Sequence, residues 1–456
     1  MKPTASLGEK WRQFAVILLP ILVTQVALSA MTFFDTNMSG RYSPADLAGV
    51  AIGVSLWNPI QTGLSGILIA ITPMVAQMLG RGRKDQIGYQ VIQGLWLALL
   101  IAGLVIGVGA LSLQPILDSL GLESRVRSVA LYYLSAMAFG VIPLFGYTVL
   151  RSFMDALGQT RVTMLITLIS LPVNIFINYL FIYGNWGFPR LGGVGSGVGS
   201  AVTYWIIFLI AIVFAHKMQP FAGYSIFRRW YGVSLAKWKE LLKIGVPIGF
   251  ATFFETAVFA AVTLMMSRYD TMTIAAHQAA INFASTLYMI PVSICMALTI
   301  LVGYEVGAKR TKDAGQYSIL GIGSAVVLSL LAAVILVVFG QQVAGLYSKD
   351  LHVIELTQQF LIYAIFFQIS DAIATPTQGA LRGYKDVNPA FFLTFVSYWL
   401  IALPVGYITA NYSGFGAFGY WIGLITGLAV GAITLLWRLV VVQRKHAKGI
   451  LPLNPK

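Results

Sequence analysis

The chain has 456 residues, of which 58% are hydrophobic and only 10% are charged. Soluble domains carry about 25% charged residues, so this composition excludes a water-soluble globular protein and indicates that much of the surface faces lipid. The formal net charge of +14 is compatible with anionic partners, but the positions of the basic residues assign it to membrane topology, and no nucleic-acid binding is expected. The single cysteine, Cys295, cannot form an internal disulfide.

Continuous apolar stretches recur along the chain and predict twelve transmembrane helices. A spanning helix needs about 20 mostly apolar residues, and the stretches lack the alternation of a barrel strand. The basic N-terminus runs into an apolar segment that is too long for a cleavable signal peptide. The second span exceeds the thickness of the lipid, so we expect it to tilt or to project beyond the bilayer. In chain order the expected spans are 14–38, 46–79, 88–113, 127–152, 160–184, 193–216, 239–267, 273–300, 316–340, 354–380, 388–411 and 416–441.

The basic residues are distributed unequally between the two sides of the membrane. If the N-terminus lies in the cytoplasm, the cytoplasmic loops and termini contain 24 of the 30 Lys and Arg residues, and the outer loops contain 6. This asymmetry is the positive-inside signal of membrane proteins. It predicts that both termini are cytoplasmic, as an even number of spans requires.

The two halves of the chain resemble each other. Residues 75–80 match 302–307, Leu150-Arg151 matches Leu381-Arg382, and 171–173 match 403–405, at offsets of 227, 231 and 232 residues. We expect an N-terminal six-helix lobe at 1–216, a cytoplasmic linker at 217–238 and a C-terminal six-helix lobe at 239–456. Because each lobe has an even number of helices, a pseudo-twofold axis along the membrane normal should relate them. A duplication kept only for stability is the alternative.

Three acidic residues fall well inside apolar runs: Asp35, Glu255 and Asp371. An Asp at the centre of a membrane helix costs about 2.5–3.5 kcal/mol, so such a residue usually faces a cavity and has a function. No Lys or Arg lies deep in a predicted helix, so a proton or a metal cation is the expected neutraliser. The alternative is structural, in which a protonated acid forms a hydrogen bond across a helix interface.

The acids of the two halves do not occupy equivalent positions. By the offset of 227 residues, Glu255 aligns with Leu28, which precedes Asp35 by seven positions. Seven residues of helix correspond to roughly 10 Å. Each half is therefore expected to carry its own acid at its own depth.

Polar residues accompany the acids in both halves. Asn174 and Asn178 are four residues apart and therefore share one helix face, as do Gln278 and Asn282, which are expected to line the cavity of the second half. His277 is either a proton relay or a structural histidine.

Charged residues at cytoplasmic helix ends form a separate group. Arg151 with Asp155, and Arg382 with Asp386, have the spacing of ion pairs within a helix. We expect them and Glu305 to be structural, with an intracellular gate as the alternative.

At these residues the chain resembles the MATE (multidrug and toxic compound extrusion) family, and is most similar to its bacterial NorM branch. The resemblance covers essentially the whole chain. The motifs that carry it are Phe34-Asp35-Thr36, Pro73-x-Val-Ala-Gln77, Leu150-Arg151, Pro172-x-Asn174 with Asn178, Gly192-Gly-Val-Gly195, Phe254-Glu255, Ala275-Ala-His-Gln278, Asp371, Leu381-Arg-Gly-Tyr-Lys-Asp386 and Ser397-Tyr-Trp399.

The resemblance implies a monomeric antiporter in the bacterial cytoplasmic membrane. It would export cationic, amphipathic drugs in exchange for Na⁺ or H⁺ by alternating access, with no cofactor. The resemblance places a cation site, tentatively for Na⁺, at Glu255 and Asp371, and a first-half site at Asp35 with Asn174 and Asn178. Phe367 stands where some relatives have a Tyr, so one possible cation ligand of the substrate cavity is absent.

Two other functions fit the sequence less well. A lipid-linked oligosaccharide flippase of the same superfamily would need a more cationic cavity than this sequence offers. An integral-membrane enzyme would need clustered nucleophiles or metal ligands, but the four histidines are scattered and no ligand-spaced motif occurs. We therefore expect a transporter that is not an enzyme.

Overall fold

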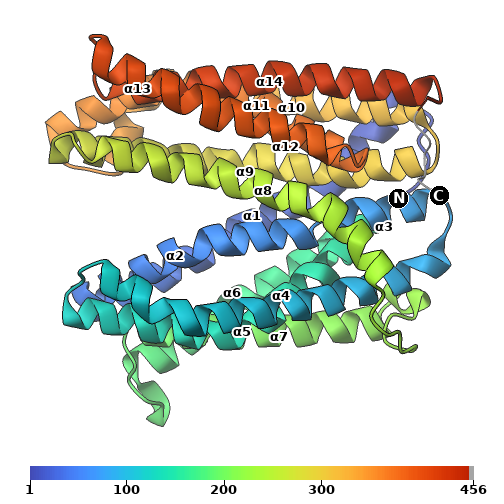
Figure 1. Ribbon diagram of the computed structural model, residues 1–456, viewed down its shortest axis with the longest axis horizontal. Coiled ribbons are helices and arrows are strands. Elements are labelled where there is room, and N and C mark those ends of the chain that lie inside the picture. The colour runs from blue at the N-terminus through green and yellow to red at the C-terminus, as the bar shows by residue number, and fades with distance from the viewer. Residues whose placement is uncertain (451–456) are drawn as a thin grey trace. The chain divides into compact units, whose positions relative to one another are not determined.

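The computed structural model describes residues 1–450, which fold into helices joined by short turns and loops (Figure 1). In this part of the chain, twelve helical segments are long and apolar enough to cross a membrane, which confirms the predicted number and the all-α class. Most of the segments are longer than predicted because polar turns continue the helix at one or both ends. The longest single helix has 37 residues, or about 55 Å, whereas the hydrocarbon core is about 30 Å thick.

Seven α-helices make up the first half. They are α1 (Leu7–Tyr42), α2 (Pro44–Leu68), α3 (Ile71–Gly80), α4 (Lys84–Ser119), α5 (Ser124–Ala156), α6 (Thr160–Tyr183) and α7 (Val194–Lys217). Two short 3₁₀ turns, η1 (Asn185–Gly187) and η2 (Phe221–Tyr224), lie on either side of α7. The second span consists of α2 and α3, so it is longer than a bilayer requires, as expected, but the helix is interrupted at residues 69–70.

The second half begins with α8 (Leu235–Met266), after the segment that joins the halves. The remaining elements are α9 (Thr271–Gly307), α10 (Thr311–Gly345), α11 (Leu351–Gly383), α12 (Val387–Phe395), η3 (Val396–Ala402), α13 (Leu403–Tyr412) and α14 (Phe418–Ala447). The eleventh span comprises α12, η3 and α13, and η3 is a π-helix. A π-helix has wider turns than an α-helix and is rare in proteins.

Packing divides the described residues into two units. One unit is Leu19–Gly249, and the other combines Met1–Leu18 with the chain from Phe250 onward. The boundaries therefore lie inside α1 and α8, whereas the predicted lobes are separated at the linker 217–238. In the second of these units, the first turns of α1 are held by an ion pair between Lys10 and Asp313 at 2.9 Å.

Close helix crossings organise each unit. In the Leu19–Gly249 unit α5 packs between α2, α4 and α7 (Figure 1). Gly140 of α5 lies against the backbone of Ala201 in α7. In the other unit α11 packs against α9, α10 and α14, and Gly379 of α11 lies against the backbone of Cys295 in α9. Small residues at such crossings allow membrane helices to approach closely, which van der Waals packing in lipid requires.

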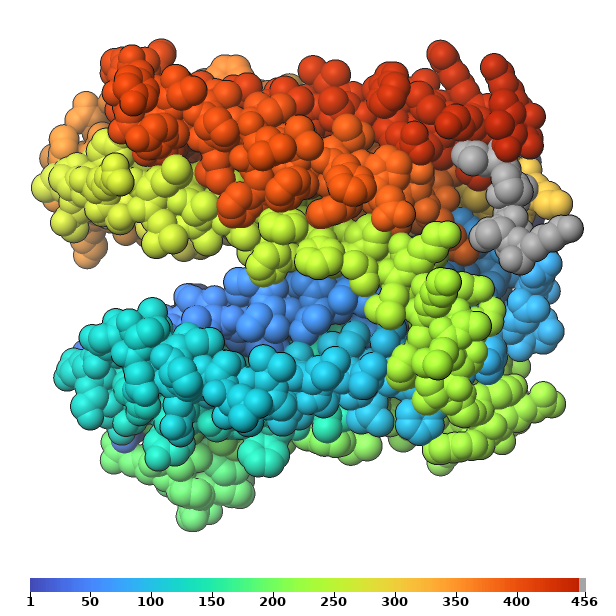
Figure 2. All heavy atoms as spheres, in the orientation of Figure 1, coloured from blue at the N-terminus to red at the C-terminus, as the bar shows by residue number. Residues whose placement is uncertain are grey.

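The segment 217–238 is bound to the first unit. The buried Gln93 of α4 donates from Nε2 to the carbonyl of Gly232 at 2.7 Å and accepts the Ser234 N–H at Oε1 at 2.8 Å. The indole of Trp96 donates to the carbonyl of Tyr231 at 3.0 Å. Figure 2 shows this yellow-green segment at the surface beside the beginning of α4. The predicted linker is therefore an ordered part of the Leu19–Gly249 unit.

Candidate functional site

Asp35 of α1 is held by polar side chains from α6 and α7. Its Oδ1 accepts the Nδ2 groups of Asn174 at 3.1 Å and of Asn178 at 2.6 Å. Its Oδ2 accepts the Ser200 hydroxyl at 3.2 Å. The structure thus brings together the three residues that sequence analysis assigned to the first half, and it adds Ser200.

The two asparagines are one turn apart on the buried face of α6. Asn178 fits because position 199 on the facing helix α7 is a glycine: a Cβ there would collide with Asn178 Oδ1. The Oδ1 atoms of Asn174 and Asn178 are buried and have no hydrogen-bond partner within residues 1–450. A carboxylate, two amide groups and a hydroxyl thus provide oxygen ligands that suit a hard cation, and the same carboxyl group can instead carry a proton.

In the second unit, Glu255 of α8 is bound by Gln378 of α11. Gln378 Nε2 donates to Glu255 Oε1 at 2.5 Å and to the Thr394 hydroxyl at 3.2 Å. Sequence analysis missed Gln378, although a signal was present. It follows Asp371 by seven residues, which is about two helical turns, so both side chains lie on one face of α11.

Asp371 has fewer partners than Glu255. Its Oδ1 accepts the Thr375 hydroxyl at 2.8 Å, and its buried Oδ2 has no hydrogen-bond partner in the described chain. The carboxylates of Glu255 and Asp371 are close enough for their charges to interact, and the hydroxyls of Tyr288 and Tyr398 lie within electrostatic range of both. The structure therefore places the two predicted acids in the same region of the second unit, each with its own hydrogen-bond partner, and two phenols lie in that region.

The oxygen atoms around these acids determine what the site can bind. In the described part of the chain, no group of three or more His, Cys, Asp or Glu side chains is arranged to hold a metal ion. Of the ion pairs found in residues 1–450, none includes Asp35, Glu255 or Asp371. A cation bound in the second unit would rely on two carboxylates and on neutral hydroxyl or amide oxygens.

The π-helix η3 fixes the backbone beside Glu255. The indole of Trp399, in η3, donates to the carbonyl of Phe254 at 3.0 Å. Tyr398 is the preceding residue, so the wide turns of η3 position both the indole that binds Phe254 and the Tyr398 phenol. π-bulges occur frequently at functional sites.

Two predicted cavity residues lie elsewhere on α9. Gln278 and Asn282 are exposed, and no hydrogen bond joins either side chain to Glu255 or Asp371 in the described residues. Their place in a substrate cavity stays a prediction. The third cavity residue, Phe367, is buried one turn before Asp371 and packs edge-on against Phe259 and Trp421, with ring centroids 5.6 and 6.2 Å away, so it belongs to the apolar core of the second unit.

His277 is fully buried and satisfied at both ring nitrogens. The indole of Trp421 lies 2.9 Å from Nδ1, and the Thr263 hydroxyl lies 3.4 Å from Nε2. Because an indole N–H can only donate, Nδ1 is an acceptor and the neutral ring carries its proton on Nε2. This geometry favours the structural alternative for His277 over the relay.

One of the two predicted pairs at helix ends is confirmed and the other is wrong. Arg151 Nε lies 3.5 Å from Asp155 Oδ2. Asp386 instead pairs with Arg438, because α11 ends at Gly383 and the chain turns through a left-handed residue, Lys385 (φ 61°), before Asp386.

Two other charged residues at helix ends also have partners. Arg382 donates to Cys295 Sγ at 3.7 Å, and its positive charge acts on Glu255. Glu305 is fully buried and pairs with Arg310 at 2.5 Å, as expected of a structural acid.

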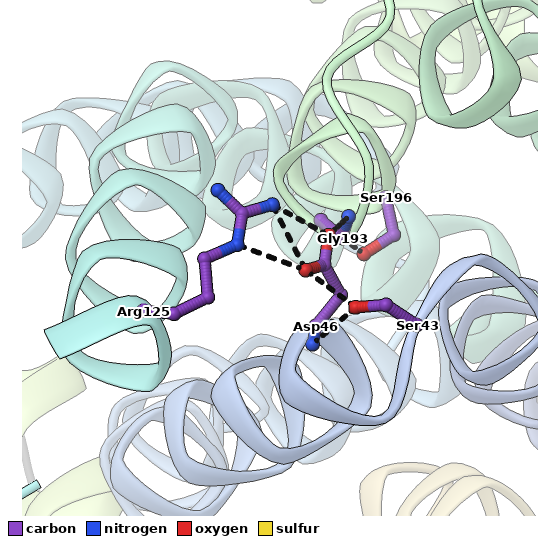
Figure 3. Close-up of polar contacts among 5 residues, drawn as sticks. All are labelled: Ser43, Asp46, Arg125, Gly193 and Ser196. Carbon is purple, nitrogen blue, oxygen red and sulfur yellow. Dashed lines mark hydrogen bonds and ion pairs between the residues drawn. The ribbon is translucent and has the colours of Figure 1, made fainter. Parts of the chain in front are cut away.

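Sequence analysis missed another buried acid, Asp46, which joins α2, α5 and α7 (Figure 3). Its carboxylate accepts Arg125 Nη2 at 2.9 Å, the Gly193 N–H at 2.6 Å and the Ser43 hydroxyl at 2.8 Å. The Asp46 N–H in turn donates to Ser43 Oγ at 3.0 Å. The spacing Ser43-x-x-Asp46 is that of a helix capping box, so the signal was present in the sequence.

Comparison with protein families yields a repeated match. The MatE family model matches residues 20–180 and again 247–408. The two matches begin 227 residues apart, which is the offset of the first motif pair in the sequence. The internal repeat is therefore confirmed.

Individual relatives extend over nearly the whole chain. A probable multidrug resistance protein NorM from Halalkalibacterium halodurans is 58% identical and covers 98% of both chains. The protein of the same name from Bacillus subtilis is 55% identical and covers 98% of this chain and 99% of its own. The structure of the Vibrio cholerae MATE transporter VcmN in the bent form has a TM-score of 0.86 at 16% identity, over 97% of this chain and 98% of that one, which indicates the same fold.

Proposed function

Because this chain belongs to the MatE family, a family of multi-pass membrane transporters that are not enzymes, we propose that it exports cationic, amphipathic organic compounds in exchange for Na⁺ or protons. The names of its relatives support multidrug efflux and favour it over the flippase alternative. In this proposal the protein acts as a monomer in the bacterial cytoplasmic membrane, with both termini in the cytoplasm. The transport cycle requires no cofactor.

The observation that carries the proposal is the set of three acids held only by neutral donors. Asp35 is bound by amides and a hydroxyl, Glu255 by an amide, and Asp371 by a hydroxyl. An acid in a membrane helix that lacks an ion-pair partner marks an ion or proton pathway. A proton or a hard cation is the neutraliser that can leave and return during each cycle.

The remaining roles follow from this assignment. Glu255 and Asp371 bind the coupling ion in the second six-helix lobe, and Asp35 with Asn174 and Asn178 forms a separate site in the first. The predicted cavity residues Gln278, Asn282 and Phe367 contact the exported compound. Coupling requires the ion and the compound to favour different conformations, because a ligand shifts an equilibrium only by its differential affinity.

Transport in proteoliposomes tests the proposal. Na⁺ and pH gradients are imposed independently, and efflux of ethidium is recorded for the wild type and for Glu255→Gln, Asp371→Asn and Asp35→Asn. The matched control is Glu355→Gln, because Glu355 is an exposed acid at the beginning of α11. We expect the control to transport normally and the Glu255 and Asp371 variants to lose gradient-driven efflux by about tenfold or more. Undiminished gradient-driven efflux in both of these variants would show that the coupling assignment is wrong.

A further inference from the structure

A cavity of about 520 Å³ lies in the Leu19–Gly249 unit between helices α4, α5 and α7 and the segment 226–231. We propose that it binds one anionic phospholipid of the cytoplasmic leaflet. An acyl chain would occupy the space between the helices, and the phosphate group would lie against Arg228 and Arg229. This inference goes beyond the proposed transport activity and uses only the proposed orientation of the chain.

The helical walls of the cavity are apolar. They include Leu95 and Leu99 of α4, Ile142 of α5 and Phe208 of α7. Leu99 is also exposed, and further along α4 the side chains of Leu104 and Val108 are exposed as well. The cavity therefore opens onto an apolar helix surface that an acyl chain can follow.

The remaining wall of the cavity is basic and aromatic. Arg228 and Arg229 line it, are exposed, and form no ion pair within the described residues. Trp230 is 85% exposed and packs edge-on against Trp96 of α4, with ring centroids 5.5 Å apart. Exposed tryptophans are typical of the head-group region, and basic clusters there attract anionic lipids.

The length of α4 is consistent with a head-group position for this wall. The helix has 36 residues and is therefore about 54 Å long, compared with a hydrocarbon core of about 30 Å. Its first turns extend beyond the hydrocarbon on the side that the charge distribution assigns to the cytoplasm.

The basic wall is held in place by the protein itself. Gln93 and Trp96 bind the backbone of Tyr231, Gly232 and Ser234, directly after the two arginines. A preformed site loses less conformational entropy when it binds a ligand. Because the apolar walls offer few partners to a small inorganic anion, and the arginines repel an organic cation, the occupant that fits is an amphiphile with a negative head group.

Native mass spectrometry of the purified full-length protein tests this site. Binding of phosphatidylglycerol is compared with binding of phosphatidylcholine with the same acyl chains, for the wild type and for the double variant Arg228→Gln/Arg229→Gln. The matched control is Lys237→Gln/Lys239→Gln, which removes two charges from the same stretch of chain outside the cavity. Each basic side chain near an anionic surface contributes about a fivefold factor, so we expect about 25-fold weaker phosphatidylglycerol binding in the arginine variant and little change in the control.

A third variant tests the apolar part of the site. Leu99→Trp fills the space between the helices at an exposed position and should displace phosphatidylglycerol although both arginines remain. Equal losses in the arginine and lysine variants, or equal binding of phosphatidylcholine, would overturn the proposal. Displacement by millimolar inorganic phosphate would also overturn it, by assigning the arginines to a free anion. Because lipid binding is measured without a gradient, failure of the antiport proposal would leave these results unaffected.

Discussion

Asp386, just beyond the end of α11, forms a bidentate ion pair with Arg438 of α14, although Arg382 precedes it by only four residues. Arg438 Nε lies 2.7 Å from Oδ2, and Nη2 lies 2.8 Å from Oδ1. The pair joins the turn between α11 and α12 to the last helix. It also leaves Arg382 free to turn toward Cys295, where its charge acts on Glu255.

Replacing Arg438 should destabilise the protein. Arg438→Gln leaves Asp386 without its bidentate partner in a site that is only partly open to solvent, so we expect a loss of about 2 kcal/mol in the free energy of unfolding. Thermal unfolding of the detergent-solubilised protein provides the measurement. Arg444→Gln, at an exposed position on the same helix, is the control. Equal melting temperatures for the two variants would contradict the structural role of the pair.

Replacing Arg382 should change ion dependence more than stability. The positive charge of Arg382 opposes the binding of the coupling ion, Na⁺ or a proton, at Glu255. Arg382→Gln should therefore lower the ion concentration needed for half-maximal transport by roughly threefold to tenfold. Proteoliposome efflux measured against Na⁺ concentration and against pH provides the readout. The control is Arg161→Gln, at the exposed beginning of α6. If the half-saturating concentrations of both variants match the wild type, Arg382 does not influence the ion site.

Adding a methyl group at Gly199 should disturb the Asp35 site. The new Cβ of Gly199→Ala would collide with Asn178 Oδ1 and displace the amide that donates to Asp35. Overpacking of this kind costs about 1–3 kcal/mol, and we expect lower transport together with a lower melting temperature. Gly103→Ala is the control, because nothing lies within 4 Å of a Cβ at that position in α4. Normal transport by Gly199→Ala would mean that the hydrogen bond from Asn178 to Asp35 is not needed for transport.

Replacing Arg125, the cation beside Asp46, should lower the stability of the protein without altering the ion sites. Arg125→Gln removes the cation that faces the fully buried Asp46 carboxylate, whereas Gly193 and Ser43 still donate to it (Figure 3). Because the Arg125 side chain is itself half-exposed, we expect a loss of about 2 kcal/mol, less than for a fully buried pair. Arg127→Gln should have almost no effect, since its partner Asp118 is mostly exposed. If the unfolding midpoints of Arg125→Gln and Arg127→Gln differ by less than a degree, the Asp46–Arg125 ion pair does not stabilise the protein as predicted.

The sequence predicted features that depend on local periodicity. Twelve apolar runs define the spans, and the spacing of Asn174 and Asn178 places both amides on one helix face. Partnerships across helices could not be predicted in this way. Gln378 and Arg438 reach their acids only because particular helices pack together, and hydropathy carries no information about which helices do so. The π-helix η3 was also unpredictable, since the change from i→i+4 to i→i+5 hydrogen bonds leaves no compositional trace.

The limits of the packing units determine how this protein could be divided into fragments. A break in the segment 225–234 would give two pieces of nearly equal length. The first piece would keep residues 1–18, although these pack with the chain beyond Phe250, and it would lack Gly245 and Gly249, whose backbones lie against Ile67 and Gly63. Each fragment would therefore retain a helix end that belongs to the core of the other and would lack one of its own. Each half expressed alone should therefore fold poorly, whereas the two halves expressed together should assemble into the folded protein.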